Sequence, residues 1–287
     1  MIAIRTLSHQ HRIALLCRVL RVNRSTYYKW LDRAPSAREV ENRAIRSCIL
    51  DLYAKTDKRL GTRKITDCLR RDYCINISCG RVYRLLKTMN LPKMSTVKPP
   101  KSRYIGNASD GDCVNRLQQK FDPPAPNQVW VCDFTYIHVN NRFFYLCAIM
   151  DLYARKIIAY KLSGRINTQL AIDTLDAAIA ARGNIQGLLF HSDRGSQFTA
   201  EAFRKHLDAL GIVQSFSAKG HPYDNAVMEC FFKYLKKEET NRRIYASFEE
   251  LSSSLFLYIN GFYNSVRPHS HNNGFSPNQM EQRFFIS

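Results

Sequence analysis

The sequence predicts an α/β fold in which an all-helical region precedes a core built on a mixed five-stranded sheet with flanking helices. Two observations support this division. Apolar residues recur at helical spacing before residue 91, whereas strand-like alternation begins after residue 127. The charge changes as well, because residues 1–120 hold 26 Lys and Arg against 9 Asp and Glu, while residues 121–287 hold 17 against 15. A front half of charge +17 predicts a polyanionic partner.

We expect four segments along the chain. Residues 1–91 form a helical DNA-binding region with two helix-turn-helix-like units, and residues 92–126 form a basic, proline-rich linker. The core follows at 127–245, and a helical extension at 246–287 ends the chain. The sequence contains no run of 18 apolar residues, so no membrane span is predicted. We expect a cytoplasmic, nucleoid-associated protein without a membrane partner. Nine cysteines without a CxxC pair favour reduced thiols over a zinc site.

The first helix-turn-helix-like unit is predicted between residues 11 and 31. Two short helices flank a tight turn there, and Ser25 is expected to cap the second. That second helix should turn Arg24 and Lys29 outward and pack Tyr28 inward. In such a unit the second helix enters the major groove of DNA.

Three longer helices follow at 38–55, 62–73 and 78–89, and Thr62 and Ser78 are the expected N-caps of the last two. The last helix has a cationic stripe opposite its apolar side. Such a stripe is also typical of an ordinary solvated face, but in a segment of charge +17 we favour contact with phosphates. The cations of the stripe are Arg81, Arg84 and Lys87.

From residue 128 onward the periodicity predicts strands first and then strands alternating with helices. The predicted strands are 129–139, 143–152, 156–162, 188–190 and 212–216. The predicted helices are 167–181, 199–210 and 224–239. A hairpin turn is expected at Asn140-Asn141, and Thr199 is expected to cap its helix. Three antiparallel strands followed by this alternation describe an RNase H-like fold.

Three carboxylates stand at positions that can converge on one site. Asp133 lies in the first strand, Asp193 follows a buried strand, and Glu229 lies in a helix, with 35 residues between the last two. Carboxylate oxygens are the ligands that magnesium prefers. We therefore expect two magnesium ions, with manganese as a substitute, in a site suited to phosphodiester chemistry.

The surroundings of these carboxylates carry further candidate residues. Lys233, Lys236 and Lys237 share the predicted outer face of the Glu229 helix, and Lys219 lies in the Gly/Pro-containing loop before it. Phosphate contacts beside a metal ligand are one interpretation, and an ordinary Glu–Lys helical pair is the other.

Two more polar residues near the carboxylates have a structural and a chemical interpretation. His191 is favoured as a structural hydrogen-bonding residue over a proton shuttle. Asp151 is expected to close a turn, with Arg155 as its candidate partner, in place of serving as a fourth metal ligand.

The sequence runs 128–136, 191–198 and 222–229 closely resemble DDE transposases of bacterial insertion sequences. The match is closest to the IS-three group, whose members are related to retroviral integrases. The tail at 262–269 and 275–277 is similar to the C-terminal signature of that group. One departure is Ala218, because the family more often has Arg at this place in the loop.

The resemblance implies that Asp133, Asp193 and Glu229 are the catalytic triad of a DNA transposase, and that Lys236 contacts DNA ends. It implies metal-dependent strand cleavage and strand transfer at insertion-sequence ends. The implied partners are terminal inverted repeats, target DNA, further copies on DNA, and the product of the upstream reading frame, whose zipper this chain lacks. The predicted DNA-binding residues are Arg24, Lys29, Arg81, Arg84, Lys87, Lys219, Lys233, Lys236 and Lys237.

Two other functions share parts of this pattern. An RNase H-type metal nuclease that only hydrolyses would need the same carboxylates but no helical arm. A helix-turn-helix regulator with an inactive core would need the arm alone, which the intact Asp133, Asp193 and Glu229 argue against. A generally basic soluble protein would not explain why the charge asymmetry coincides with the carboxylate pattern.

Overall fold

The computed structural model describes residues 1–92, 113–140 and 142–286. Contacts divide the chain into two compact units, residues 1–51 and residues 52–287. Helix α4, Ala37–Lys55, runs from the first unit into the second. It begins with a capping box, because the backbone N–H of Ser36 donates to Glu39 Oε2 (2.7 Å) and the N–H of Glu39 donates to Ser36 Oγ (3.3 Å).

The first unit contains three short helices before α4, one more than the sequence predicts. They are α1 Ile2–Leu7, α2 Ile13–Val19 and α3 Arg24–Leu31. The small core buries Tyr27, whereas the predicted Tyr28 is exposed. The predicted cap is wrong too, because Asn23 caps α3 by accepting the backbone N–H of Ser25 at 2.9 Å. Helix α3 therefore begins two residues earlier than predicted, and Tyr27 is the residue that it packs into the core.

The second unit begins with two helices that pack against each other, α5 Thr62–Asp72 and α6 Cys79–Met89. Ser78 caps α6 as predicted, since its Oγ accepts the N–H of Arg81 at 3.3 Å. Thr62 does not cap α5, because it is already the first helical residue and Gly61 holds the cap position. The buried side chains of the pair are Ile65, Thr66, Cys68, Leu69, Val82 and Leu85.

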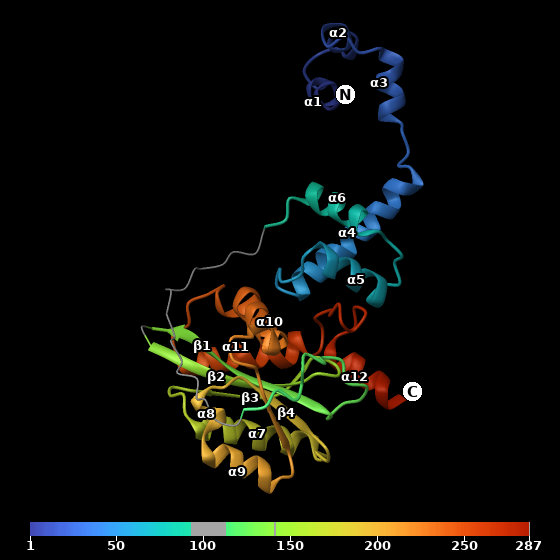
Figure 1. The fold of residues 1–287 in the computed structure, drawn as a ribbon. Helices are drawn as coiled ribbons and strands as arrows, with labels where there is room; N and C mark the ends of the chain where they lie inside the picture. Colours follow the sequence, from blue (N-terminus) through green and yellow to red (C-terminus); the bar gives the residue numbers. More distant parts are fainter. Residues whose placement is uncertain (93–112, 141, 287) are drawn as a thin grey trace. The chain divides into compact units, whose positions relative to one another are not determined.

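A mixed five-stranded sheet forms the centre of the second unit, in the order β3-β2-β1-β4-β5, which confirms the predicted fold class (Figure 1). The first three strands are antiparallel, and β4 and β5 run parallel to β1. The strands are β1 Val129–Val139, β2 Arg142–Asp151, β3 Lys156–Ser163, β4 Leu189–Ser192 and β5 Val213–Phe216. Asn140 has a positive φ of 41° at the predicted turn, and Asn141 lies outside the described residues.

Helices cover both faces of this sheet, with α7, α8 and α9 on one face and α10 and α11 on the other (Figure 1). The first face carries an apolar core that includes Trp130, Cys132 and Phe190. The helices of that face are α7 Thr168–Arg182, α8 Ser196–Thr199 and α9 Glu201–Ala209. The helix predicted at 199–210 is α9, which begins two residues later because Thr199 is the last residue of α8. The hydroxyl of Thr199 bonds Gly195 O and does not cap α9.

The predicted helix at 224–239 is divided. A 3₁₀ turn, η1 Pro222–Asn225, leads into α10 Ala226–Leu235, and a π-helical turn, η2 Lys236–Thr240, follows. The helices after it are α11 Phe248–Phe256, the π-helical η3 Leu257–Tyr263 and α12 Pro277–Ile286. π-turns are rare and often occur at functional sites, so the one that continues the Glu229 helix is of interest.

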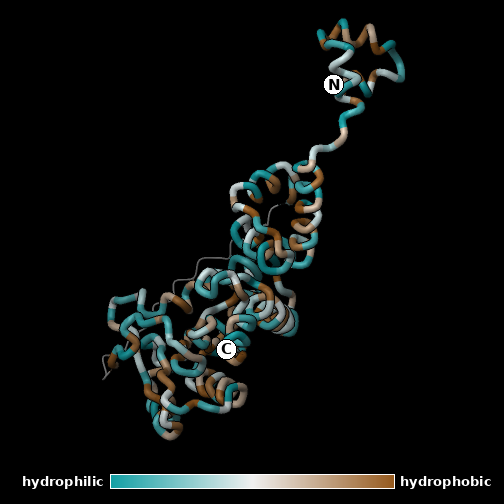
Figure 2. Tube along the Cα trace, turned by 90° about the vertical axis from the view of Figure 1, so that its right-hand side faces the viewer, coloured by the Kyte–Doolittle hydropathy of each residue, from teal (hydrophilic) through white to brown (hydrophobic). Residues whose placement is uncertain are grey.

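Part of the predicted linker is packed on the core. Residues 93–112 lie outside the described residues, but the carbonyl of Val114 accepts the N–H of Phe216 on β5. Ser215 Oγ accepts the N–H groups of Arg116 (2.9 Å) and Leu117 (3.1 Å). Hydrophobic and hydrophilic residues alternate along the chain (Figure 2), and no helix among the described residues is long and apolar enough to cross a membrane.

Candidate active site

Strands β1 and β4 bring two of the predicted carboxylates together. Val129 lies opposite Leu189 and Val131 opposite His191, so the same register places Asp133 beside Asp193. Asp193 follows the last residue of β4, at the carboxyl end of a parallel pair, where ligands of open α/β sheets commonly bind. The two carboxylates therefore lie side by side, Asp133 within the central strand β1 and Asp193 just after the neighbouring strand β4.

The pKa values of both aspartates are raised. Burial is the largest cause for Asp133, and the negative charges of Asp193 and Glu229 raise the pKa of Asp133 further. Burial also raises the pKa of Asp193, although the hydrogen bond from Gly195 N–H, 2.9 Å, acts in the opposite direction. Asp193 stays accessible to solvent at the surface. Two carboxylates that destabilise each other's charged forms are suited to a divalent cation.

Backbone groups hold both carboxylates in place. The N–H of Phe134 donates to Asp133 Oδ1 at 2.7 Å, as the N–H of Gly195 does to Asp193. Gly195 is also required for space, because a Cβ there would lie 3.0 Å from Asp193 Oδ1 and 3.1 Å from Gln197 Oε1. Any side chain at this position would push the Asp193 carboxylate aside.

His191 is structural, as the sequence favoured. It is buried, its Nδ1 lies 2.9 Å from Ser215 Oγ, and its Nε2 lies 3.2 Å from Ser217 Oγ. Burial lowers the pKa of His191 to about 4, so the ring is neutral near pH 7. Its two hydrogen bonds join the end of β4 to β5 and to the loop that follows β5.

Asp151 closes the turn after β2, as predicted, but with a different partner. It accepts the N–H groups of Asn127 (2.8 Å) and Tyr153 (3.0 Å) and pairs with Arg182 at 3.2 Å. The expected pairing with Arg155 is wrong, since that guanidinium bonds the carbonyl of Phe121 and the Asp122 carboxylate. The Asp151 carboxylate is therefore occupied by contacts that hold the turn.

Glu229 lies near the aspartates without joining them. Asn225, at the start of α10, donates to the carbonyl of Cys132 at 3.3 Å, which fixes the helix to β1 beside Asp133. The Glu229 side chain is exposed, and its charge reaches Asp133, whose pKa it raises. Within residues 1–92, 113–140 and 142–286, no three His, Cys, Asp or Glu side chains lie closely enough to hold a metal ion. The structure thus brings Asp133 and Asp193 together and leaves Glu229 at a greater distance.

One side of α10 is buried in the apolar core. It presents Met228, Phe231, Phe232 and Leu235, whereas Val227 and Tyr234 are only partly buried. Val227 and Tyr234 line a cavity on the flank of the helix. A second surface of α10 therefore stays open.

The predicted lysines of this helix face in different directions. Lys236 Nζ lies 4.6 Å from the centre of the Tyr136 ring, and its charge interacts with Asp133. Burial lowers the pKa of Lys236, which Asp133 counteracts. Lys237 lines the cavity, and Lys233 is exposed. The predicted continuous cationic face is therefore divided by the π-turn.

The other predicted DNA-binding residues lie mostly at the surface. Arg24 and Lys29 are exposed on α3 in the first unit. In the second unit Arg84 and Lys87 are exposed on α6, and Lys219 is exposed in the loop before η1. Arg81 is partly buried. The exposure of these side chains is compatible with phosphate contacts, and the contacts themselves stay predictions.

Sequence reasoning missed a buried ion cluster in η2. Glu238 pairs with Lys64 of α5 (2.7 Å) and with Arg267 of the tail (2.8 Å), and it accepts the hydroxyl of Tyr258 (2.9 Å). Although burial raises the pKa of Glu238, the hydrogen bond and the charge of Arg267 outweigh it, and the pKa is lowered. The signal for this cluster that the sequence offered was the pair of adjacent glutamates, Glu238 and Glu239, directly after Lys236 and Lys237.

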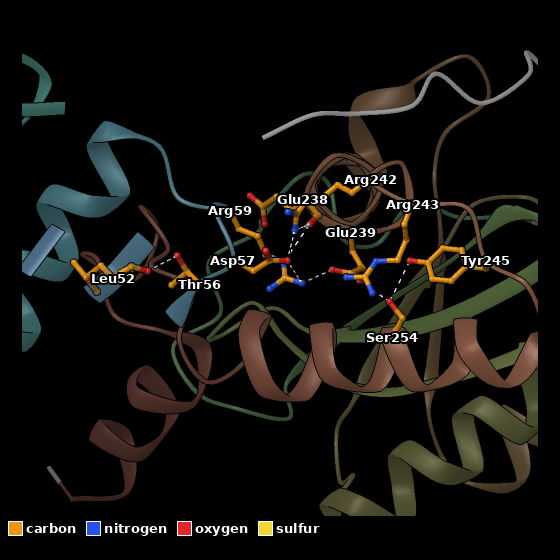
Figure 3. A network of polar contacts seen from close by, with 10 residues as sticks. All are labelled: Leu52, Thr56, Asp57, Arg59, Glu238, Glu239, Arg242, Arg243, Tyr245 and Ser254. Atoms are coloured by element: carbon orange, nitrogen blue, oxygen red, sulfur yellow. Dashed lines mark hydrogen bonds and ion pairs between the residues drawn. The ribbon is translucent and has the colours of Figure 1, made fainter. Parts of the chain in front are cut away.

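Glu239 belongs to the same cluster. It pairs with Arg59 and with Arg243, and the hydroxyl of Ser254 donates to it, as Figure 3 shows. Arg242, next to Arg243, pairs with Asp57 at 2.8 Å. These contacts tie the segment between α4 and α5 to the end of the Glu229 helix.

Comparisons with known proteins agree with this architecture. An integrase core domain family matches residues 123–222, a second integrase core domain family matches 210–277, and an HTH-like domain family matches 39–99. The chain is 34% identical over 271 residues to the insertion element IS600 uncharacterized 31 kDa protein of Shigella sonnei, covering 94% of this chain and 98% of the relative. It is 33% identical over 274 residues to transposase InsF for insertion sequence IS3A of Escherichia coli K12, covering 94% of each.

Among solved structures, the HTLV-2 integrase catalytic core domain in complex with magnesium matches at 16% identity. The match covers 55% of this chain and 98% of that one, with a TM-score of 0.37. A mixed sheet that places two aspartates side by side defines an integrase-type core, and a helix-turn-helix-like region precedes it as a helical arm. The chain belongs to the IS3 family of insertion-sequence transposases, as its identity to relatives over nearly their whole length shows.

Proposed function

We propose that this chain is a transposase that cleaves and joins DNA strands at the ends of an insertion sequence, in a metal-dependent reaction. The observation that carries this proposal is the Asp133–Asp193 pair, whose pKa values are raised at one edge of the sheet. In the family to which the chain belongs, carboxylates at matching positions of the motifs form the catalytic triad. We assign Asp133, Asp193 and Glu229 to this role.

The residues fit a magnesium site. Asp133 and Asp193 present carboxylate oxygens side by side. Burial raises the pKa of both, and the charge of Asp193 raises the pKa of Asp133 further, so their charged forms are disfavoured without a cation. Asp133 and Asp193 would hold two magnesium ions, or manganese in their place, and Glu229 would complete the site. When bound, the metal would supply Lewis-acid stabilisation of the attacking and leaving oxygens of a phosphodiester.

The chain itself orients the reacting groups. The Phe134 and Gly195 N–H groups fix the two aspartates, and Asn225 fixes the start of the helix that carries Glu229. Glu229 is exposed and unconstrained by an ion pair among the described residues, so its side chain can turn toward the aspartates. Lys236, beside Asp133, places a positive charge where a DNA phosphate would approach.

DNA is the proposed partner of the basic helices as well as of the site. Phosphate contacts by Arg24, Lys29, Arg81, Arg84 and Lys87 would hold the inverted repeats, and Lys219, Lys233, Lys236 and Lys237 would contact DNA near the carboxylates. We further propose a homo-oligomer on DNA, because joining two element ends requires at least two protomers. The upstream-reading-frame product of the same element is the proposed second partner.

A strand-transfer assay tests the function. The purified chain, with and without the upstream-frame product, is incubated with magnesium, a target plasmid and an oligonucleotide that carries the element end with a free 3′-hydroxyl. We expect joined products that disappear in Asp133→Asn and Asp193→Asn but persist in Lys161→Ala, an exposed lysine of β3. Hydrolysis without joining would identify a nuclease, and DNA binding without either product would identify a regulator.

A further inference from the structure

A cavity of about 1150 Å³ lies along the flank of α10, within the second unit. Its walls come from α5, α6, α10, η2 and the loop that follows η3. Cys230, the residue after Glu229, lines it, as do Ala226 and Tyr234 of the same helix. The cavity therefore begins one residue from the proposed catalytic glutamate, on the surface of α10 that the apolar core leaves open.

The charge of this cavity is strongly positive. Eight lysine and arginine side chains line it, against the two carboxylates of Asp67 and Glu238. Lys64 and Arg267 both pair with Glu238, and burial, with the charge of Arg267, lowers the pKa of Lys64 to about 8. These deep cations already serve in the ion cluster.

Four other cations of the lining behave differently. Among the residues that the structure describes, Lys58, Arg63, Lys87 and Lys237 make no ion pair, and all four are exposed. Lys87 comes from α6 and Lys237 from η2, so unneutralised charge faces the cavity from two elements. Uncompensated cations around a hollow favour an anionic ligand.

The cavity also presents aromatic surface. Tyr83 of α6 is 57% exposed at its wall. Tyr234 is covered by cations, with Lys64 Nζ 4.7 Å and the Arg267 guanidinium 4.1 Å from its ring centre. Tyr83 therefore offers a ring face for a planar ligand, whereas Tyr234 holds the cationic wall in place.

We propose that this cavity binds an unpaired DNA strand, through phosphates on Lys87 and Lys237 and a base stacked on Tyr83. Sites for single strands combine a cationic groove with exposed aromatic rings, as here. Reading the base edges of a duplex instead requires an element that enters a groove about 12 Å wide, and a hollow does not provide one. DNA as the source of the strand rests on the proposed function, since cleavage at an element end can release an unpaired strand beside Glu229.

The test uses the full chain and a fluorescein-labelled oligothymidylate of about 12 nucleotides, with binding followed by anisotropy between about 0.05 and 0.3 M salt. The double variant Lys87→Ala/Lys237→Ala should bind about tenfold more weakly. Its log–log salt slope should be shallower by about 1.4, because each single-strand phosphate contact contributes about 0.7. Tyr83→Ala should weaken binding about tenfold, the loss typical of one stacked base.

The matched control is Lys161→Ala/Lys205→Ala, which removes two exposed lysines outside the cavity. It should keep the affinity and slope of the unchanged chain. A duplex of the element end should lose less affinity than the single strand in the cavity variant, because Arg24, Lys29, Arg81 and Arg84 remain to hold the duplex. Equal losses for duplex and single strand, or cavity variants that bind like the control, would overturn the proposal.

A second measurement locates the strand. An oligonucleotide with 5-iododeoxyuridine is cross-linked by light, and the modified peptide is identified by mass spectrometry. The peptide containing Tyr83 should carry the cross-link, also in Asp133→Asn, which leaves the cavity unchanged. A cross-link confined to other peptides would contradict the site. Loss of strand transfer does not enter these readouts, so this proposal and the proposed function can fail separately.

Discussion

The second unit holds two pairs of acidic residues that differ in how their charges are compensated. Asp133 and Asp193 lie side by side with raised pKa values, and backbone N–H groups and the nearby Lys236 are their main favourable contacts. Glu238 and Glu239 are more deeply buried, yet arginine and lysine side chains neutralise them, and the pKa of Glu238 is lowered. Burial alone does not mark a reactive carboxylate. The difference lies in whether the fold supplies the counter-charge or leaves it to a ligand.

The largest effect should follow from changing the uncompensated pair. Asp133→Asn or Asp193→Asn should reduce strand transfer at least about 1000-fold, because each removes an oxygen ligand of the proposed metal site. Glu229→Gln should have a similar effect if this residue completes the site. The measurement is the rate of joined-product formation with magnesium and with manganese.

Stability separates this effect from misfolding. Asp133→Asn removes a carboxylate whose charged form the folded protein disfavours, so its melting temperature without magnesium should be equal to or above that of the unchanged chain. Added magnesium should raise the melting temperature of the unchanged chain and not that of the variant. A variant that melts earlier and still joins DNA would remove the distinction between the two pairs.

Replacing a carboxylate of the compensated pair should reduce the stability of the fold, in contrast to the effect expected for Asp133→Asn. Glu238→Gln leaves the buried Arg267 and the partly buried Lys64 beside a neutral side chain, which should lower the free energy of unfolding by about 3–5 kcal/mol. The measurement is urea unfolding, and the matched control is Glu249→Gln. Glu249 is exposed, so its change should leave the free energy of unfolding nearly unaltered. A cost as small as that of the control would mean that the cluster contributes no stability.

The pH dependence sharpens the same comparison. The pKa of Glu238 in the folded protein lies below its ordinary value of 4.5, so its stabilising contribution is fully present above that value. The contribution is lost as the pH falls from 4.5 through the lowered pKa. The difference in unfolding free energy between the unchanged chain and Glu238→Gln should therefore be constant from pH 7 to about 5 and shrink below 4.5. A difference that grows toward acidic pH would show that the assigned direction is wrong.

The two pairs also differ in how far the sequence predicted them. Asp133 and Asp193 could be placed because alternation defines a strand to within a residue or two, and the parallel pairing of β1 with β4 brings the middle of β1 beside the end of β4. The Glu238–Lys64–Arg267 cluster could not, because its partners lie far apart in the chain and no local pattern joins them. Sequence patterns specify the elements that carry a site more readily than the contacts that anchor them.

Helix starts were the weakest part of the prediction for a related reason. Thr62 stands at the first helical position, one residue after the true cap, and Ser25 lies two residues after Asn23. A hydroxyl near a helix start fits either position, and only the backbone geometry decides between them. The break at Ala200 and the π-turn after Leu235 depend on packing that periodicity does not express.

The smallest predicted effect concerns the support of the uncompensated pair. Gly195→Ala would place a Cβ 3.0 Å from Asp193 Oδ1, so the carboxylate must shift and the fit of the metal ligands worsens. We expect strand transfer to fall about tenfold, because the second layer around a metal site commonly contributes 10–100-fold. The magnesium concentration for half-maximal activity should rise with it, while the melting temperature changes little. Gly261→Ala is the control, since a Cβ there meets nothing within 4 Å, and it should leave activity and magnesium dependence unchanged. If Gly195→Ala keeps the activity and the magnesium dependence of the unchanged chain, the site tolerates a displacement of Asp193. The aspartate pair would then differ from the glutamate pair through its lack of a fixed counter-charge and not through precise placement.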